Sequence, residues 1–164
     1  MTAAAAPATS ALRGRAAALA VVAAGFAGGA VDGVDASAVG LIHGRSVVRV
    51  WQGVAGGWLG KSAADGGVPS ALLGLATHFG IAIFMAAAFA LVASRVQALY
   101  RRPLLAGAAY GLVLYGIMYR IVLPLRWPAI FPRWDGVQSL TDIASHMGVG
   151  LAIAWMLARA ARRP

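Results

Sequence analysis

Asp142 and His146 stand four positions apart in this sequence, and a second histidine, His78, lies in another apolar tract. Residues at i and i+4 share one face of a helix. A carboxylate beside an imidazole can relay a proton or orient a metal-ligating histidine, so His78 and His146 are the candidate metal ligands. Two histidines on different helices also meet the minimum for a b-type haem, and this alternative stays open.

Three other ionisable residues lie in or at the ends of apolar tracts, namely Asp32, Asp35 and Arg120. Charged groups inside a bilayer are costly, usually face the bundle interior or water, and mark functional sites. A structural role is the other interpretation, because an arginine in hydrocarbon needs a carboxylate partner. The predicted polar cluster, a candidate ligand or proton site, comprises Asp32, Asp35, His78, Arg120, Asp142 and His146.

The chain that must position these residues has a very apolar composition. Of its 164 residues 60% are hydrophobic and 12% are charged, and its mean hydropathy is +0.76. A soluble domain is about 25% charged, and a soluble fold of this composition would expose much apolar surface. The composition therefore predicts an all-α membrane protein with the lipid bilayer as its main partner.

Positive charge and the absence of cysteine narrow the function further. Fourteen Lys and Arg outnumber five acidic residues, which gives a formal net charge of +9. The arginines form short clusters between apolar tracts, as topology-setting charges do, so nucleic acid is not an expected partner. No cysteine is present to form a disulfide or a thiolate metal site. Because hydrolase and phosphate-binding motifs are also absent, we expect no enzymatic activity and no bound cofactor.

Four apolar tracts are long enough to cross a ~30 Å hydrocarbon core, which takes about 20 helical residues. These tracts cover about 16–37, 70–94, 103–124 and 139–159, and together they form one membrane domain, 16–159. Residues 1–15 are expected to form a disordered cytoplasmic tail, and 160–164 a second, short one. A cleaved signal peptide is the alternative for the first tract, since Ala36-Ser37-Ala38 has the composition of a cleavage site.

Residues 46–61 have a different, amphipathic pattern. One predicted face carries Val47, Val50, Trp51, Val54, Ala55, Trp58 and Leu59, and the other carries Arg49, Gln52, Gly53, Gly56, Gly60 and Lys61. Such a helix suits the headgroup boundary, or it could re-enter the bundle. The predicted fold is thus a four-transmembrane-helix bundle with an additional interfacial or re-entrant helix between spans one and two.

Glycines four positions apart predict close contacts between helices. Three such pairs occur, Gly25 with Gly29, Gly53 with Gly57, and Gly107 with Gly111. Because glycine and alanine are abundant in this chain, we interpret these pairs as packing features.

The distribution of arginine and lysine predicts the orientation. The N-terminal flank, residues 95–102 and the C-terminus hold eight cations and no acid, whereas the opposite side holds six cations and all five aspartates. The positive-inside rule counts only the cations and places both termini in the cytoplasm of a bacterial inner-membrane protein. In this topology the polar cluster lies in the outer half of the bundle.

Several short motifs occur in a particular order. The segment GGWLGKSAADGG follows the first tract, Leu75–Phe79 has the pattern LxxHF, Leu105–Gly111 has LAGAxYG, Val122–Leu125 is VLPL, and Asp142 precedes His146 and Met147. In this order the chain, over about 16–157, resembles small bacterial multi-pass inner-membrane proteins of unknown function, loosely similar to YagU-type proteins. The resemblance implies four spans and inner-membrane placement, and it implies no activity.

These observations favour a structural or partner-binding role for the polar cluster, with a homo-oligomer or another membrane protein as the partner. A small proton-linked transporter or channel-like protein is the alternative, and a metal- or haem-binding membrane protein is a further one. Because four short spans make a narrow bundle, a conduction path would need an oligomer.

Overall fold

The structure, a computed structural model, describes residues 14–162, and this part of the chain is helical without any strand. The elements are α1 (Gly14–Ile42), α2 (Val47–Leu59), the 3-10 turn η1 (Gly60–Ala64), α3 (Gly67–Arg95), α4 (Ala98–Arg101), α5 (Pro103–Ile117), the π-helical turn η2 (Met118–Val122), α6 (Leu123–Arg126) and α7 (Val137–Ala161). Of the two predicted tails, residues 1–13 and 163–164 lie outside the described residues. Residues 14–15 begin α1 and residues 160–161 end α7.

Four helical stretches are long and apolar enough to cross a membrane, namely α1, α3, the continuous stretch Pro103–Arg126, and α7. The shortest has 24 residues, which at ~1.5 Å per residue gives about 36 Å. The prediction of four apolar helices in an all-helical chain is confirmed. Each helix extends beyond its predicted span at one or both ends, because helical hydrogen bonding continues into polar flanks that hydropathy leaves out.

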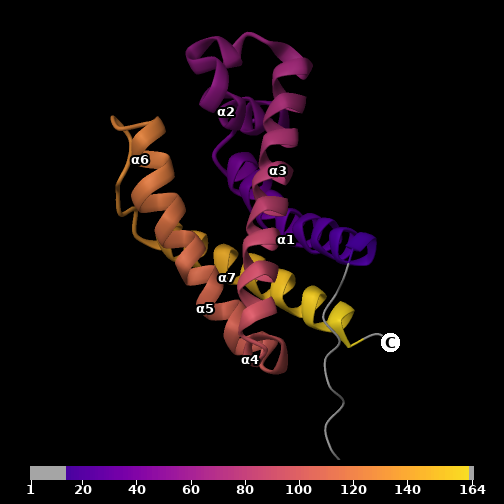
Figure 1. Cartoon of the computed structure of the whole chain (residues 1–164). Helices are drawn as coiled ribbons and strands as arrows, with labels where there is room; N and C mark the ends of the chain where they lie inside the picture. Colours follow the sequence, from indigo (N-terminus) through magenta and orange to yellow (C-terminus); the bar gives the residue numbers. More distant parts are fainter. Residues whose placement is uncertain (1–13, 163–164) are drawn as a thin grey trace, which may run out of the picture.

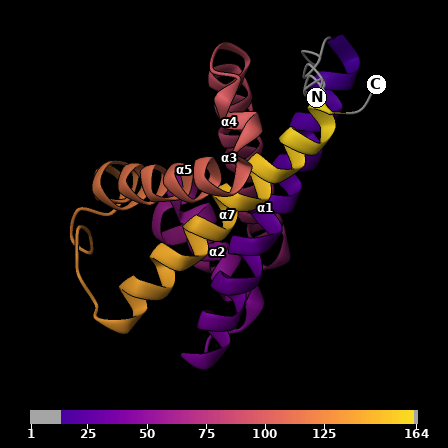
Figure 2. The same ribbon diagram turned by 90° about the horizontal axis from the view of Figure 1, so that it is seen from below.

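The long helices cross in two pairs, α1 with α3 and α5 with α7. α1 and α7 lie side by side and run in opposite directions, so that the start of α1 and the end of α7 share one end of the molecule (Figure 2). α3 crosses α1, while α5 crosses α7 and leads out to α6 (Figures 1 and 2). α2 lies beside the start of α3, and α4 lies at the other end of α3 (Figure 1).

Glycine allows close approach at both crossings. A Cβ added to Gly29 of α1 would lie 2.8 Å from the Phe79 ring of α3, and one added to Gly107 of α5 would lie 2.7 Å from the main-chain oxygen of Gly150 of α7. Their predicted partners in sequence lie at the same crossings. Gly53, from the third predicted pair, has nothing within 4 Å of an added Cβ, so this pair makes no helix contact of that kind.

Large apolar side chains are found on the surface of the bundle as well as in its core. Ile153 and Leu157 of α7 are fully buried, with alanines from α1 and α3 packed around them. Large apolar side chains also point outward: Phe84 is 73% exposed and Leu125 is 79% exposed. A soluble monomer rarely presents so much apolar surface, whereas a helix bundle in lipid needs it.

The predicted amphipathic helix forms as α2, and its buried face matches the predicted apolar face only in part. Trp51 is buried, and its main chain touches Gly74 of α3. Gln52, predicted on the polar face, is buried too, and its amide donates a hydrogen bond to the Gly67 carbonyl oxygen at 3.0 Å. Trp58, predicted on the apolar face, is exposed. The choice between an interfacial and a re-entrant position stays a prediction.

The third long helix is interrupted by the π-helical turn η2. A π turn accommodates one extra residue and often occurs at functional sites. Here Met118 and Tyr119 are half-buried and face the interior, whereas Arg120 is exposed. The turn therefore separates the packed part of α5 from α6.

Candidate functional site

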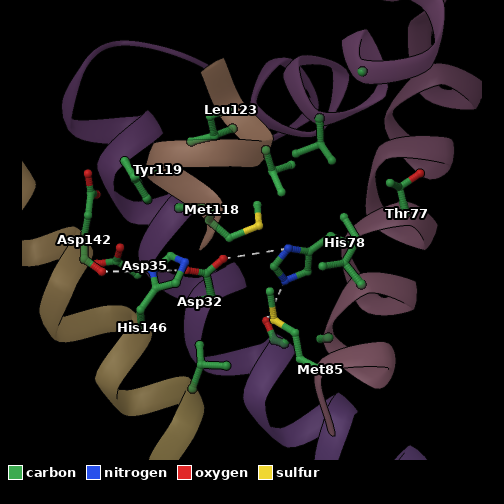
Figure 3. Close-up of a pocket in the computed structure, with 18 of the residues that line it drawn as sticks. Asp32, Asp35, Thr77, His78, Met85, Met118, Tyr119, Leu123, Asp142 and His146 are labelled. Atoms are coloured by element: carbon green, nitrogen blue, oxygen red, sulfur yellow. Dashed lines mark hydrogen bonds and ion pairs between the residues drawn. The ribbon is translucent and has the colours of Figure 1, made fainter. Parts of the chain in front are cut away.

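The carboxylate of Asp32, on α1, lies between the two histidines of the predicted cluster (Figure 3). Its Oδ2 is 3.8 Å from Nδ1 of His78 on α3, and its Oδ1 is 3.9 Å from Nδ1 of His146 on α7. The hydroxyl of Ser145 donates a hydrogen bond to Oδ1 at 3.2 Å. One carboxylate thus joins three of the four long helices, and we call Asp32, His78 and His146 the Asp32 junction.

The hydrogen bonds of His78 define which of its edges faces Asp32. Nε2 lies 2.8 Å from the main-chain oxygen of Gly29; since a carbonyl only accepts, Nε2 carries a proton and donates. The Nδ1 edge therefore faces Asp32. At 3.8 Å, Nδ1 and Oδ2 are too far apart for a hydrogen bond, and a protonated Nδ1 would make this contact an ion pair.

His146 is held by its own helix as well as by Asp32. Nδ1 donates a hydrogen bond to the main-chain oxygen of Asp142 at 2.9 Å. The ring edge meets the faces of Tyr115 and Tyr119, with centroids 5.9 Å and 5.6 Å apart. Because the contact of His146 is with the Asp142 main chain, the expected carboxylate–imidazole pair within α7 is not formed in this structure. The carboxylate beside the imidazole is that of Asp32.

Two further carboxylates of the predicted cluster lie beside the Asp32 junction. Asp35, one turn along α1, and Asp142, one turn before His146 on α7, line the same cavity, and Figure 3 shows both near His146. The Gln138 amide donates a hydrogen bond to Asp142 Oδ1 at 2.8 Å. Five of the six predicted residues are therefore brought together.

Arg120 is the predicted member that the structure leaves out. Its side chain is exposed, and among the described residues no hydrogen bond or ion pair joins it to an aspartate. His43 is also remote, at the exposed end of α1, where Nδ1 lies 2.8 Å from the Val39 oxygen. The cation that lines the cavity is instead Arg126 of α6, whose Nε donates a hydrogen bond to the Gly57 oxygen.

The junction lies in an open cleft of about 830 Å³, within the range of small-molecule sites. One wall is formed by α2 and α3, the other by η2 and α6, and α1 and α7 close the base. Apolar side chains provide most of the lining, including Met85, Met118 and Leu123 (Figure 3). The charged and imidazole side chains from α1, α3 and α7 gather around Asp32, whereas Thr77 lies apart from them (Figure 3), and a few placed polar groups in an apolar lining are typical of ligand sites.

The formal charge of the cleft is negative. Asp32, Asp35 and Asp142 line it together with one arginine, Arg126, so the net charge is −3 + 1 = −2 before any proton binds a histidine. Aromatic side chains of Trp58, Tyr119 and Trp127 also line the cleft. Carboxylates and aromatic faces both attract cations.

Metal binding finds no further support in this geometry. Within the described residues, no group of three or more histidine, aspartate or glutamate side chains is arranged to hold a metal ion. One nitrogen of each histidine, Nε2 of His78 and Nδ1 of His146, already binds a main-chain carbonyl. The candidate metal ligands therefore act here as hydrogen-bonding partners.

No family model matches this chain, and neither a curated protein nor a solved structure is similar to it. The fold and site define a class all the same, that of an all-helical protein with four membrane-length apolar helices around a polar cleft. The resemblance to YagU-type proteins stays a prediction.

Proposed function

We propose that this protein spans a bacterial inner membrane, with both termini in the cytoplasm, and binds a small organic cation with an apolar body in the cleft, in exchange for a proton. The observation that carries the proposal is the placement of the Asp32 carboxylate, between two imidazoles, at the base of an apolar cleft of about 830 Å³. The common end shared by the start of α1 and the end of α7 supports a topology with both on one side of the membrane (Figure 2), and the distribution of arginine and lysine favours the cytoplasmic side.

The depth of the junction supports a ligand that enters the membrane. Asp32 is ten residues from Ile42, His78 is eleven from Gly67, and His146 is nine from Val137, counting to the helix ends on one side. At ~1.5 Å per residue the junction lies about 14–17 Å along each helix from that end, which puts it inside the ~30 Å core, in the outer half of these helices. Negative charge at that depth is unfavourable unless a proton or another cation neutralises it.

Proton exchange follows from this requirement. When the cleft is empty, a proton on the Asp32 junction lowers the cost of its charge. A bound cation takes over that role, so the proton is released to water. The other titratable or charged groups that line the same cleft are Asp35 on α1, Asp142 on α7, Tyr119 on η2 and Arg126 on α6.

Isothermal titration of the detergent-purified protein with tetraphenylphosphonium, an apolar cation, tests the proposal. We expect binding to the native protein, with release of protons measured by a pH-sensitive dye. Asp32→Asn should weaken binding by about 10- to 100-fold, since a unit charge at about 6 Å and an effective dielectric constant of about 20 contributes at most about 3 kcal/mol.

The control is Asp65→Asn, which removes the same charge from an exposed position outside the cleft. It should bind like the native protein. If tetraphenylphosphonium does not bind the native protein, or if the Asp32 and Asp65 variants bind it equally well, the proposal fails.

A purely structural role for the junction predicts a different result. In that case Asp32→Asn lowers the melting temperature, because α1 loses its contacts with α3 and α7, and the native protein shows no cation binding. Transport is a separate step beyond binding: uptake of tetraphenylphosphonium into proteoliposomes driven by a pH gradient would establish it, and the narrow bundle predicts that such uptake needs an oligomer.

A further inference from the structure

A second cavity, of about 650 Å³, lies where α4 and the start of α5 meet the end of α7. Four arginines from two distant parts of the chain line it: Arg101, Arg102, Arg159 and Arg162. α4 and the beginning of α5 lie beside the end of α7 at this end of the molecule (Figure 1). We call these residues the arginine pocket. It is separate from the cleft around Asp32, with which it shares no lining residue.

The arginine pocket has four positive charges, and no acidic side chain is among the described residues that line it. The five acidic residues of the chain are at positions 32, 35, 65, 135 and 142, and among the described residues none of them forms an ion pair with these arginines. The guanidinium of Arg159 lies over the Trp155 ring at 5.4 Å, and that of Arg162 donates a hydrogen bond to the Tyr100 oxygen at 3.2 Å. Two of the four cations are thus held in place without being neutralised.

The start of α5 adds hydrogen-bond donors to the arginine pocket. The helix begins at Pro103, and the main-chain N–H groups of Leu104 and Leu105, in its first turn, have no partner within the helix. A helix N-terminus with free N–H groups favours an anion, and phosphate in particular. α5 has 15 residues, long enough to sustain this effect. Arginine forks and main-chain donors together suit a phosphate group.

The outer rim of the pocket is apolar. Leu104 and Leu105 also line it, and they are 66% and 67% exposed, while Trp155 is 47% exposed. A free phosphate would leave these side chains without a partner. A phospholipid would place its phosphate on the arginines and its acyl chains along the leucines and the indole, and basic pockets between membrane helices bind such headgroups.

We infer that the arginine pocket binds one anionic phospholipid, with the phosphate on Arg101, Arg102, Arg159 and Arg162 and the acyl chains along Leu104, Leu105 and Trp155. The inference rests on the proposed insertion in a membrane and not on cation binding in the cleft. It assigns the pocket to the leaflet that faces the arginine-rich end, which the proposed orientation makes the cytoplasmic one.

Native mass spectrometry of the full chain in a neutral detergent tests this assignment. Phosphatidylglycerol, phosphatidylcholine with the same acyl chains, and inorganic phosphate are added separately. We expect one bound phosphatidylglycerol at about tenfold lower concentration than phosphatidylcholine. The double variant Arg101→Gln with Arg159→Gln should lose this preference, and Arg101→Lys with Arg159→Lys, which keeps the charge, should retain part of it.

The matched control is Arg15→Gln with Arg95→Gln, which removes two charges from exposed positions outside the pocket. It should bind phosphatidylglycerol like the native protein. Equal binding of the two lipids, or equal loss in the control, would overturn the inference. Displacement of the bound lipid by millimolar inorganic phosphate would also overturn it, since the site would then recognise phosphate alone. Cation binding in the cleft is measured separately and has no bearing on these outcomes.

Discussion

Substitution of Gly111 by alanine tests whether the close contact between α5 and α7 positions His146. A Cβ at this position would lie 2.8 Å from the carbonyl carbon of His146, and still closer to its oxygen and to the Cα of Met147. All three are main-chain atoms, so no side-chain rotation can relieve the contact. The two helices must therefore move apart.

The size of this movement follows from the distances. Ordinary contact begins at 3.4 Å, so relief of the contact with the carbonyl carbon alone requires 3.4 − 2.8 = 0.6 Å, and the two closer atoms require a larger separation. Overpacking of this kind lowers the free energy of unfolding by about 1–3 kcal/mol. Alanine also favours the helix over glycine by about 0.5–1 kcal/mol, which acts in the opposite direction and must be subtracted.

Gly116→Ala supplies this correction. It lies on the same helix, and nothing is found within 4 Å of an added Cβ. We expect the melting temperature of Gly111→Ala in detergent to be lower than that of Gly116→Ala by about 2–12 °C, taking about 2–4 °C per kcal/mol for a chain of this size. Tetraphenylphosphonium affinity should fall in the Gly111 variant only, because Tyr115 and Tyr119 then move away from the His146 ring that they contact beside the cleft.

Equal melting temperatures for the two variants would refute the reasoning, because the contact between α5 and α7 would then not constrain the helices. A lower melting temperature with unchanged cation affinity would keep the packing argument and reject the role of His146 in the cleft.

Three further expectations concern charge. Arg120→Ala should accumulate normally and melt within about 2 °C of the native protein, since substitution of an exposed residue that has no partner among the described residues changes the free energy of unfolding by at most about 0.5 kcal/mol. Loss of folded protein in membrane fractions would show that Arg120 has a partner after all. Arg126→Gln should bind tetraphenylphosphonium a few-fold more tightly than the native protein, because the substitution removes a positive charge from the lining of the cleft. The effect is opposite to that of Asp32→Asn. Weaker binding in the titration would contradict the electrostatic argument. Tetraphenylphosphonium affinity should decrease as the pH falls from about 8 to 5, because protons that bind the Asp32 junction add positive charge and compete with the ligand. The affinity of the native protein is measured in buffers of equal ionic strength. An affinity independent of pH would exclude proton exchange.

Much of the fold could be predicted from hydropathy, because four apolar tracts of membrane length have few alternatives. The polar cluster could be predicted in part, because a charge inside an apolar helix must find a partner. This argument correctly grouped Asp32, His78 and His146. It could not identify Asp32 as the shared partner, since that depends on how α1, α3 and α7 cross.

Arg120 shows what was missing from the prediction. The sequence argument compared the depth of residues along the helices and left out the face on which each one lies. Arg120 is two positions beyond Met118, or about 200° around the helix at ~100° per residue, so it points away when Met118 points inward. Arg126 follows Tyr119 by seven positions, two helical turns, and this spacing could have placed it on the cleft side.

The pair Asp142 and His146 shows the limit of spacing within one helix. Residues at i and i+4 are neighbours, and these two residues are in contact. The contact joins the His146 ring to the Asp142 main chain, because an imidazole on a helix can reach the carbonyl one turn back. Which carboxylate such a histidine faces is decided by another helix.

The π-helical turn η2 (Met118–Val122) adds one residue to the winding of the third long helix. Removing this one inserted residue would rotate α6 and Trp127 by about 100° about the helix axis and shorten the helix by ~1.5 Å. Arg126 would then lose its hydrogen bond to the Gly57 oxygen, and the indole of Trp127 would move with it. Conversion of the π-helical turn to regular α-helix would therefore release the contact of α6 with α2. This change requires no movement of α1, α3 or α7.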